Sequence, residues 1–291
     1  MTREDMGAGR WDTRDGRSRA EMSSGPARDS DRPARDLHVD ELAVLVWPDG
    51  SAAAMAAARD SADALSRAIA DRGEAVAMFA AGASHAEMLD LLLKGGQSSL
   101  GVAWRKVRVV QMDEYVGLPL GHPAALGTFI ADHLTGRVAL RGTCTIDPSP
   151  GLDPEEVARA HAACLGGLAL DLCVVGIGDN GHLAFNEPSV ADPEDPKRAK
   201  IVELEEATRR QQVARGWFPT IDDVPALGVT TTMPVLLSAR NVVGLCAGAR
   251  RSGLLGRMLL GAVTPRLPAS LLRKVPGARL HLDEASASRL A

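Results

Sequence analysis

Short apolar runs alternate with longer segments of helical pattern from Leu42 to near the end of the chain. Short apolar runs bounded by turn residues are typical of buried strands. They predict strands at residues 42–46, 75–79, 107–112, 171–177, 227–232 and 242–247. The segments between them predict helices at residues 51–72, 84–94, 154–165, 250–260 and 269–272. Strands that alternate with helices predict an α/β fold in which a mostly parallel sheet is covered by helices on both faces.

The first 38 residues differ in composition from the rest of the chain. They are rich in Arg, Asp, Gly, Ser and Pro and contain almost no aliphatic side chains. Such a segment buries too little apolar surface to offset the entropy that it would lose on ordering. We therefore predict a disordered N-terminal extension at residues 1–38 and one compact domain at residues 39–291.

Composition and charge narrow the classes of partner. Hydrophobic residues make up 45% of the chain and aromatic residues only 3%, so aliphatic side chains and alanines must fill the core. The formal net charge is -4, which gives no support to nucleic-acid binding. The sequence has no run of about 18 apolar residues, and its N-terminus lacks the apolar core of a secretory signal peptide. These features predict a cytoplasmic protein that binds neither nucleic acid nor membrane.

The cysteines give no sign of a metal site. Cys144, Cys164, Cys173 and Cys246 form no C-x-x-C pair, which argues against zinc. Cys173 and Cys246 lie inside apolar runs. We predict that the cysteines are buried, reduced thiols.

Four segments that follow predicted strands carry candidate chemistry, because ligands of open α/β sheets bind beyond the carboxyl ends of the strands. The first, Gly82-Ala83-Ser84, lies between a predicted strand and a predicted helix. Small residues let the backbone approach a ligand closely, and a helix N-terminus favours an anion. The segment therefore predicts a phosphate cradle. The alternative is a helix capping box formed by Ser84 and Glu87.

The second segment holds two adjacent carboxylates, Asp113 and Glu114, directly after the predicted strand at residues 107–112. Burying such a pair is costly unless the side chains are solvated, paired or functional. Adjacent side chains on a strand point to opposite faces, so only one of the two can face a common site. A charge pair at the edge of a loop is the alternative.

The third and fourth segments contribute a histidine and two cations. Residues 178–188 read GDNGHLAFNEP and place His182 between Asn180 and Glu187. Imidazole titrates near neutrality and suits proton transfer, and a neighbouring amide or carboxylate would fix its orientation. Arg250 and Arg251 stand at the start of a predicted helix, where a bound anion would relieve their conflict with the helix dipole. Solvated side chains are the alternative in both segments, but together the four segments predict a site that moves protons on a phosphorylated sugar.

Two of these segments also carry a family resemblance. Residues 112–119 (MDEYVGLP), followed by His122-Pro123, and residues 178–188 resemble the two signature loops of glucosamine-6-phosphate deaminases. The resemblance extends from about Val39 to near the C-terminus. It implies a Rossmann-like α/β fold shared with 6-phosphogluconolactonases and conversion of glucosamine 6-phosphate and water to fructose 6-phosphate and ammonia. It implies no metal and no organic cofactor.

The resemblance also implies roles for individual residues. Asp113 would be the base that moves a proton between C2 and C1, and His182 would open the pyranose ring by shuttling a proton at the ring oxygen. Asn180 and Glu187 would support His182. The segment from Gly82 to Ser84, with Ala83 between them, would bind the phosphate, together with Arg251 in place of the family's usual lysine.

The chain departs from the family pattern at several of these positions. Asn180 stands where the family often has an acid, and Asp179 precedes it. Ala81 and His85 replace residues of the usual phosphate loop. A second phosphate-binding arginine has three candidates, namely Arg209, Arg210 and Arg215. These departures put the identity of the substrate in doubt more than the class of reaction.

Other functions remain open from the sequence. A 6-phosphogluconolactonase would share the fold, although His182 is followed by a sequence that favours the deaminases. A non-catalytic sugar-phosphate sensor or an isomerase of another amino-sugar phosphate, such as galactosamine 6-phosphate, are further alternatives. The sequence does not specify the oligomeric state, so a homo-oligomer stays open.

Overall fold

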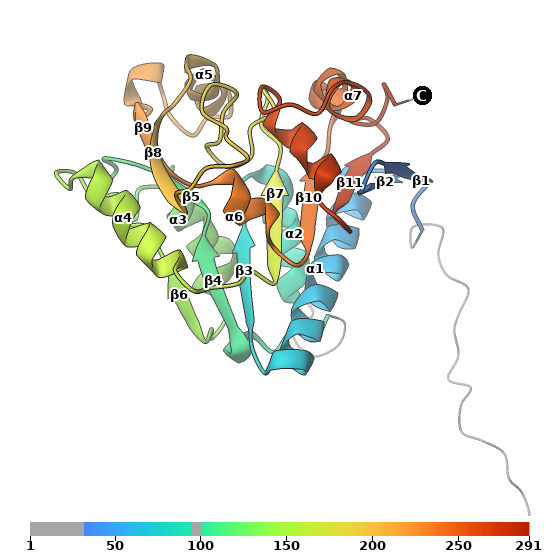
Figure 1. Ribbon diagram of the computed structural model, residues 1–291, viewed down its shortest axis with the longest axis horizontal. Coiled ribbons are helices and arrows are strands. Elements are labelled where there is room, and N and C mark those ends of the chain that lie inside the picture. The colour runs from blue at the N-terminus through green and yellow to red at the C-terminus, as the bar shows by residue number, and fades with distance from the viewer. Residues whose placement is uncertain (1–31, 95–99, 291) are drawn as a thin grey trace, which may run out of the picture.

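The computed structural model describes residues 32–94 and 100–290, and in this part of the chain the strands form two sheets (Figure 1). The larger has eight strands in the order β1-β2-β11-β10-β7-β3-β4-β6, all parallel except the β1–β2 pair. Its strands are β1 (Arg35–Val39), β2 (Leu42–Trp47), β3 (Ala75–Phe79), β4 (Val107–Gln111), β6 (Gly142–Cys144), β7 (Leu172–Gly176), β10 (Val242–Cys246) and β11 (Arg279–Asp283). The smaller sheet is antiparallel, in the order β5-β9-β8, and consists of β5 (Asp113–Tyr115), β8 (Ala199–Glu203) and β9 (Leu227–Thr231).

Helices of several lengths connect these strands. The α-helices are α1 (Gly50–Arg72), α2 (Ala83–Lys94), α3 (Leu126–Ile130), α4 (Pro154–Leu165), α5 (Glu206–Ala214), α6 (Met233–Leu237) and α7 (Ser252–Leu260). Shorter helical segments are η2 (Trp104–Lys106), η3 (Ala131–Thr135), η4 (Ile221–Asp223), η5 (Ala249–Arg251) and η6 (Pro268–Lys274).

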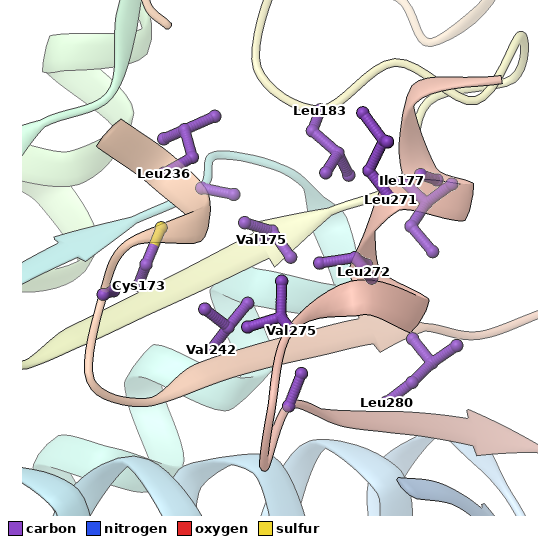
Figure 2. Close-up of a cluster of buried hydrophobic side chains, with 14 of the residues drawn as sticks. Cys173, Val175, Ile177, Leu183, Leu236, Val242, Leu271, Leu272, Val275 and Leu280 are labelled. Carbon is purple, nitrogen blue, oxygen red and sulfur yellow. The ribbon is translucent and has the colours of Figure 1, made fainter. Parts of the chain in front are cut away.

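Alternate residues of the central strands pack on opposite faces of the large sheet. In β7, Cys173 and Val175 join a cluster with side chains of α6, α7 and η6, part of which Figure 2 shows. Their neighbours Leu172 and Val174 join a second cluster with α1 and α2. Because both faces are covered, the central strands β3, β7 and β10 are apolar throughout, which is why they could be predicted from short apolar runs.

The predicted α/β fold is confirmed, and so is a strand at each of the six predicted places. One of these six was assigned to the wrong kind of sheet, because residues 227–231 form β9 of the antiparallel sheet. The capping box of Ser84 and Glu87, which was the alternative to a phosphate cradle, is not the arrangement found. Glu87 instead accepts a hydrogen bond from the Ser51 hydroxyl of α1, with an O–O distance of 2.5 Å.

The predicted N-terminal extension needs correction at its end. Residues 35–38 of that segment belong to β1, which pairs with β2. The Arg35 guanidinium donates to the carbonyl oxygens of Ala287 (3.2 Å) and Leu290 (3.3 Å), so this strand is attached to the C-terminal part of the domain. Residues 1–31 lie outside the described residues.

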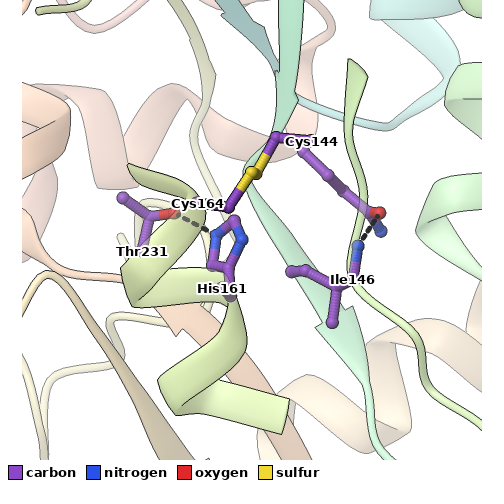
Figure 3. The surroundings of a disulfide bond; sticks show 6 residues. Cys144, Ile146, His161, Cys164 and Thr231 are labelled. Atoms are coloured by element: carbon purple, nitrogen blue, oxygen red, sulfur yellow. Dashed lines mark hydrogen bonds between the residues drawn. A yellow bond between two sulfur atoms is a disulfide. The ribbon is translucent and has the colours of Figure 1, made fainter. Parts of the chain in front are cut away.

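The prediction of reduced cysteines is wrong for two of the four residues. Cys144 of β6 and Cys164 of α4 form a disulfide, 20 residues apart in sequence (Figure 3). Cys173 and Cys246 are free and buried, as predicted. The sequence offered no C-x-x-C spacing, and only the fold brings the edge of the sheet against α4.

In the described residues, every helix is too short or too polar to cross a membrane.

Candidate active site

A cavity of about 430 Å³ lies where the large sheet meets the small one. Its walls come from the segments that follow β3, β7 and β10 and from β5. The carboxyl ends of these parallel strands lead toward the part of the molecule that holds β8, β9 and α5 (Figure 1). Of the residues proposed from the sequence, the cavity is lined by Gly82, Ala83, Ser84, Asp113, His182 and Arg251.

The segment after β3 presents backbone donors to this cavity. Gly82 adopts a φ of 152°, a conformation that L side chains rarely adopt, and α2 begins at Ala83. The amides of Ala83 and Ser84, in the first turn of α2, have no acceptor among the described residues. Free amides at the N-terminus of a helix are suited to binding an anion.

His85 lies buried beneath these amides, with 5% of its surface exposed. A Cβ atom at Gly176, in β7, would lie 2.9 Å from His85 Cε1, so this glycine makes room for the imidazole. Burial, with a smaller contribution from the charges of Arg251 and Arg215, lowers the pKa of His85 to about 4. The ring is therefore neutral at physiological pH and leaves the positive charge of the site to the arginines.

The adjacent carboxylates have opposite surroundings. Glu114 is 1% exposed, and its carboxylate accepts the amides of Tyr115 (2.9 Å), Leu126 (3.0 Å) and Gly127 (2.7 Å). Gln111 donates a fourth hydrogen bond of 2.9 Å. Glu114 thus holds the segment that leads into α3. It does not line the cavity, and only Asp113 of the two does.

Asp113 faces the cavity without a partner for its carboxyl group among the described residues. Its backbone is fixed because it pairs with Thr230 of β9. Burial, together with the charge of Glu114, raises the pKa of Asp113 to about 8. A carboxyl group with this pKa can accept a proton and return it near neutral pH.

His182 is held by the turn that follows β7. A Cβ atom at Gly178 would lie 2.1 Å from His182 Nε2, so the ring lies against the backbone of that glycine. The His182 amide donates to Asn180 Oδ1 (3.1 Å), and Nδ1 lies 3.4 Å from Thr208 Oγ1 of α5. Burial lowers the pKa of His182 to about 4, and Arg215 also lowers it. The imidazole is neutral at pH 7 and can accept a proton.

Asn180 and Glu187 lie behind His182 and do not line the cavity. Glu187 is fully buried, and its Oε2 accepts the backbone amide of Glu205 at 3.1 Å. Burial raises the pKa of Glu187 to about 7, and the neighbouring charge of Glu205 contributes. Neither side chain therefore reaches the cavity directly.

Arginines give the cavity its positive charge. Arg251 of η5 is 19% exposed, and its Nε lies 3.4 Å from Asp179 Oδ1. Arg250 is 65% exposed and pairs with the same carboxylate at 2.6 Å. Arg215 also lines the cavity, and burial lowers its pKa.

Arg215 is the one of the three alternative arginines that reaches the cavity. Arg209 donates to the carbonyl oxygen of Ile221 at 2.7 Å, and Arg210 pairs with Glu206 on the surface. The sequence could not separate the three, because α5 has no clear apolar pattern from which its faces could be assigned.

Comparison with known proteins identifies the family. The family model described as glucosamine-6-phosphate isomerases/6-phosphogluconolactonase matches residues 48–280. The chain belongs to this family. A protein from Exiguobacterium sibiricum named glucosamine-6-phosphate deaminase is 34% identical over 71% of this chain and 83% of its own length. A deaminase of the same name from Beutenbergia cavernae is 32% identical over 86% of this chain and 93% of its own.

Solved structures support the fold of the family. A monomeric glucosamine-6-phosphate deaminase has a TM-score of 0.76 at 24% identity, covering 84% of this chain and 99% of its own. The 6-phosphogluconolactonase from Trypanosoma brucei has a TM-score of 0.70 at 17% identity, covering 85% and 98%. At these identities the structures establish the shared fold alone.

Several side chains of this family member's cavity were missed from the sequence. Gln212 and Trp217 line it from the segment around α5, which was not predicted as a helix. Glu205 and Thr208 contact the proposed residues around His182. Trp217 alone offered a signal, because aromatic residues are rare in this chain.

In the described part of the chain, no group of three or more His, Cys, Asp or Glu side chains is arranged to hold a metal ion.

Proposed function

We propose that this family member converts glucosamine 6-phosphate and water to fructose 6-phosphate and ammonia. The relatives that match over most of their length carry the name of this activity. The observation that carries the proposal is the contrast between two neighbours. Glu114 is tied down by backbone amides, whereas Asp113 faces the cavity with its carboxyl group free to react.

The substrate phosphate would bind at the Gly82–Ser84 segment. The free amides of Ala83 and Ser84 provide donors, and Arg251 and Arg215 provide charge. A phosphate monoester dianion held at one end leaves the sugar carbons free to reach the other residues of the cavity. Arginine presents a planar fork of donors that suits phosphate oxygens.

His182 would open the pyranose ring. It would take the proton of the C1 hydroxyl and give it to the ring oxygen as the bond between C1 and that oxygen breaks. The neutral state of the imidazole supports the first half of this transfer. Asn180 and Glu187 would support His182 by orienting it and its turn.

Asp113 would then move the proton from C2 to C1, while the C1 aldehyde oxygen gains the proton that the C2 amino group gives up. The C2 proton is weakly acidic, so the base must be close and well oriented. The pairing of β5 with β9 holds Asp113 in place, and its raised pKa lets it retain the proton until C1 accepts it. The resulting imine at C2 would react with water and release ammonia.

The test is a substrate panel. Purified protein would be incubated separately with glucosamine 6-phosphate, galactosamine 6-phosphate and 6-phosphogluconolactone, and ammonia, ketose phosphate and acid would be measured. Ammonia and fructose 6-phosphate in equal amounts are expected. Hydrolysis of the lactone alone would assign the chain to the other branch of its family. Binding of a sugar phosphate without turnover would indicate a sensor.

The cytoplasm is the proposed location, since phosphorylated sugars are metabolised there. The Cys144–Cys164 disulfide would then meet a reducing environment. Assembly into a homo-oligomer stays a prediction, which light scattering of the purified protein would test.

A further inference from the structure

Glu205 is a carboxylate behind His182 that neither the signature loops nor the cavity lining includes. It lies between the end of β8 at Glu203 and the start of α5 at Glu206. Its side chain turns toward the loop that carries His182. There it accepts hydrogen bonds from Asn180 and from Ser189.

The hydrogen bonds of Asn180 link Glu205 to the turn of His182. The Asn180 amide group donates to Glu205 Oε2 at 3.1 Å, and its carbonyl oxygen accepts the backbone amide of His182 at 3.1 Å. Both ends of the carboxamide are therefore used, and its orientation is fixed. The Asn180 carboxamide can orient the turn but is uncharged, so Asn180 alone cannot stabilise a protonated imidazole by charge.

Charge must therefore come from a neighbouring carboxylate. Asp179 has two cationic partners, Arg250 at 2.6 Å and Arg251 at 3.4 Å, which offset part of its charge, and the rest still favours protonated His182. Glu205 has neutral donors only: the Ser189 hydroxyl at 2.7 Å, the Ser189 amide at 3.1 Å and Asn180. Among the described residues, no Lys or Arg forms an ion pair with it. Its negative charge is available to the site.

Glu187 is less suited than Glu205 to supply this negative charge, because Glu187 is the one of the pair that holds a proton. Burial raises the pKa of Glu187 to about 7, and the charge of Glu205 adds to the effect. Burial would also raise the pKa of Glu205, but hydrogen bonds from Ser189, Asn180 and Glu187 outweigh this effect, and the pKa is lowered. Between pH 4.5 and about pH 7 the negative charge of the pair therefore resides on Glu205, while Glu187 holds a proton.

We propose that Glu205 is a positioning residue that fixes the His182 turn through Asn180 and stabilises the protonated imidazole during ring opening. This inference rests on the proposed deaminase function. The proton that His182 takes from the C1 hydroxyl stays on the ring until the ring oxygen accepts it. A carboxylate nearby lowers the free energy of that imidazolium: the charge of Asp179 and, to a smaller degree, that of Glu205 oppose the lowering of the His182 pKa.

The experiment compares Glu205→Gln with Glu206→Gln, a matched control at an exposed neighbour that pairs with Arg210. The pKa of His182 is measured by NMR titration of its ring protons, with His182→Ala identifying the signal. In Glu205→Gln we expect this pKa to fall by about one unit, equivalent to about tenfold in the protonation equilibrium. In Glu206→Gln it should stay unchanged. An unchanged His182 pKa in Glu205→Gln would overturn the proposal, and this result does not depend on deamination.

Kinetics on glucosamine 6-phosphate give the second readout. Glu205→Gln should lower kcat by about tenfold and leave KM within about twofold, because the charge acts on the imidazolium and not on bound phosphate. Adding Asn180→Asp to that variant returns a carboxylate to the turn and should recover most of kcat. If kcat is not recovered although both variants melt at the wild-type temperature, the electrostatic role is wrong. If wild-type protein releases no ammonia, the proposed function fails, and the His182 titration still decides the role of Glu205.

Discussion

The two sheets of this protein make different contributions to its cavity. Segments at the ends of the large sheet supply the free amides after β3, the His182 turn after β7 and the arginines after β10. The small sheet supplies Asp113 from β5, and Glu205 follows its strand β8. Most of the proposed anion-binding groups thus come from the large sheet, with Arg215 after α5 as the exception, whereas Asp113 and Glu205 come from the small one.

This difference suggests a division of labour. Loops and helix N-termini of a parallel sheet are suited to holding a phosphate that does not react. A short antiparallel sheet next to these loops can hold a carboxylate close to the reacting carbons of the substrate. Changes to the large sheet should therefore weaken binding, whereas changes to the small sheet should slow the reaction.

The largest expected effect is that of Asp113→Asn. The amide keeps the size of the side chain but cannot accept the C2 proton, so kcat should fall by roughly 10² to 10⁴-fold. Steady-state rates of ammonia release would measure this. A variant that retains more than a tenth of wild-type kcat would remove Asp113 from proton transfer.

Glu114→Gln is the matched control on the same strand. It weakens hydrogen bonds to a buried, charged acceptor, so it should lower the free energy of unfolding by about 2 kcal/mol. Denaturant titration would compare the two variants. If Asp113→Asn and Glu114→Gln lowered the free energy of unfolding equally, Glu114 would not have the structural role that distinguishes it from Asp113.

Arg251→Ala should act mainly on binding. Removing one cation from the anion end should raise KM by about tenfold, equivalent to about 1.4 kcal/mol, and change kcat less. Arg250→Ala is the comparison: Arg250 also lines the cavity, but it is 65% exposed whereas Arg251 is 19% exposed, so we expect a smaller rise in KM. Equal KM values for Arg251→Ala and wild type would make Arg251 a structural partner of Asp179 only.

The pH dependence of kcat/KM should reflect the ionisation of Asp113. Its pKa is raised to about 8, so kcat/KM should rise with pH until this group ionises, and the Asp113→Asn variant should lack that limb. The folded state holds the proton more tightly than the unfolded state, whose pKa is near 3.8. This contribution to stability is therefore complete below pH 3.8 and is lost as the pH rises to about 8. Unfolding titrations across that window should show the variant gaining stability relative to wild type.

Breaking the disulfide should have the smallest effect on turnover. It joins β6 of the large sheet to α4, which packs on β8 and β9 of the small sheet. Cys164→Ser should lower the free energy of unfolding by roughly 3 kcal/mol through the freed loop. At a temperature where both proteins stay folded, kcat should change less than about twofold, because the disulfide does not line the cavity. A reductant should destabilise the wild type and leave the variant unchanged; equal stability of both proteins would contradict this account.

The sequence predicted the large sheet better than the small one for a physical reason. The strands β3, β7 and β10 are buried on both faces and read as apolar runs. By contrast, β5 consists of Asp-Glu-Tyr, and its pairing with β9 depends on residues far away in the sequence. Local pattern carries no information about such a partner.

The site divides in the same way. Ser84, Asp113, His182 and Arg251 could be proposed because each stands just after a recognisable strand. His85 beneath the phosphate segment and Glu205 behind Asn180 depend on contacts that only the tertiary structure creates. Asn180 could be recognised as a departure, but the carboxylate that it contacts could not.

Equilibrium binding of glucosamine 6-phosphate to Asp113→Asn tests the division between the two sheets most directly. Calorimetry with this variant should give a dissociation constant within about threefold of the wild-type KM, while no ammonia forms during the titration. Wild-type affinity without turnover would assign binding to the large sheet and proton transfer to the small one. Loss of binding in this folded variant would contradict the account, because it would make Asp113 part of the binding site.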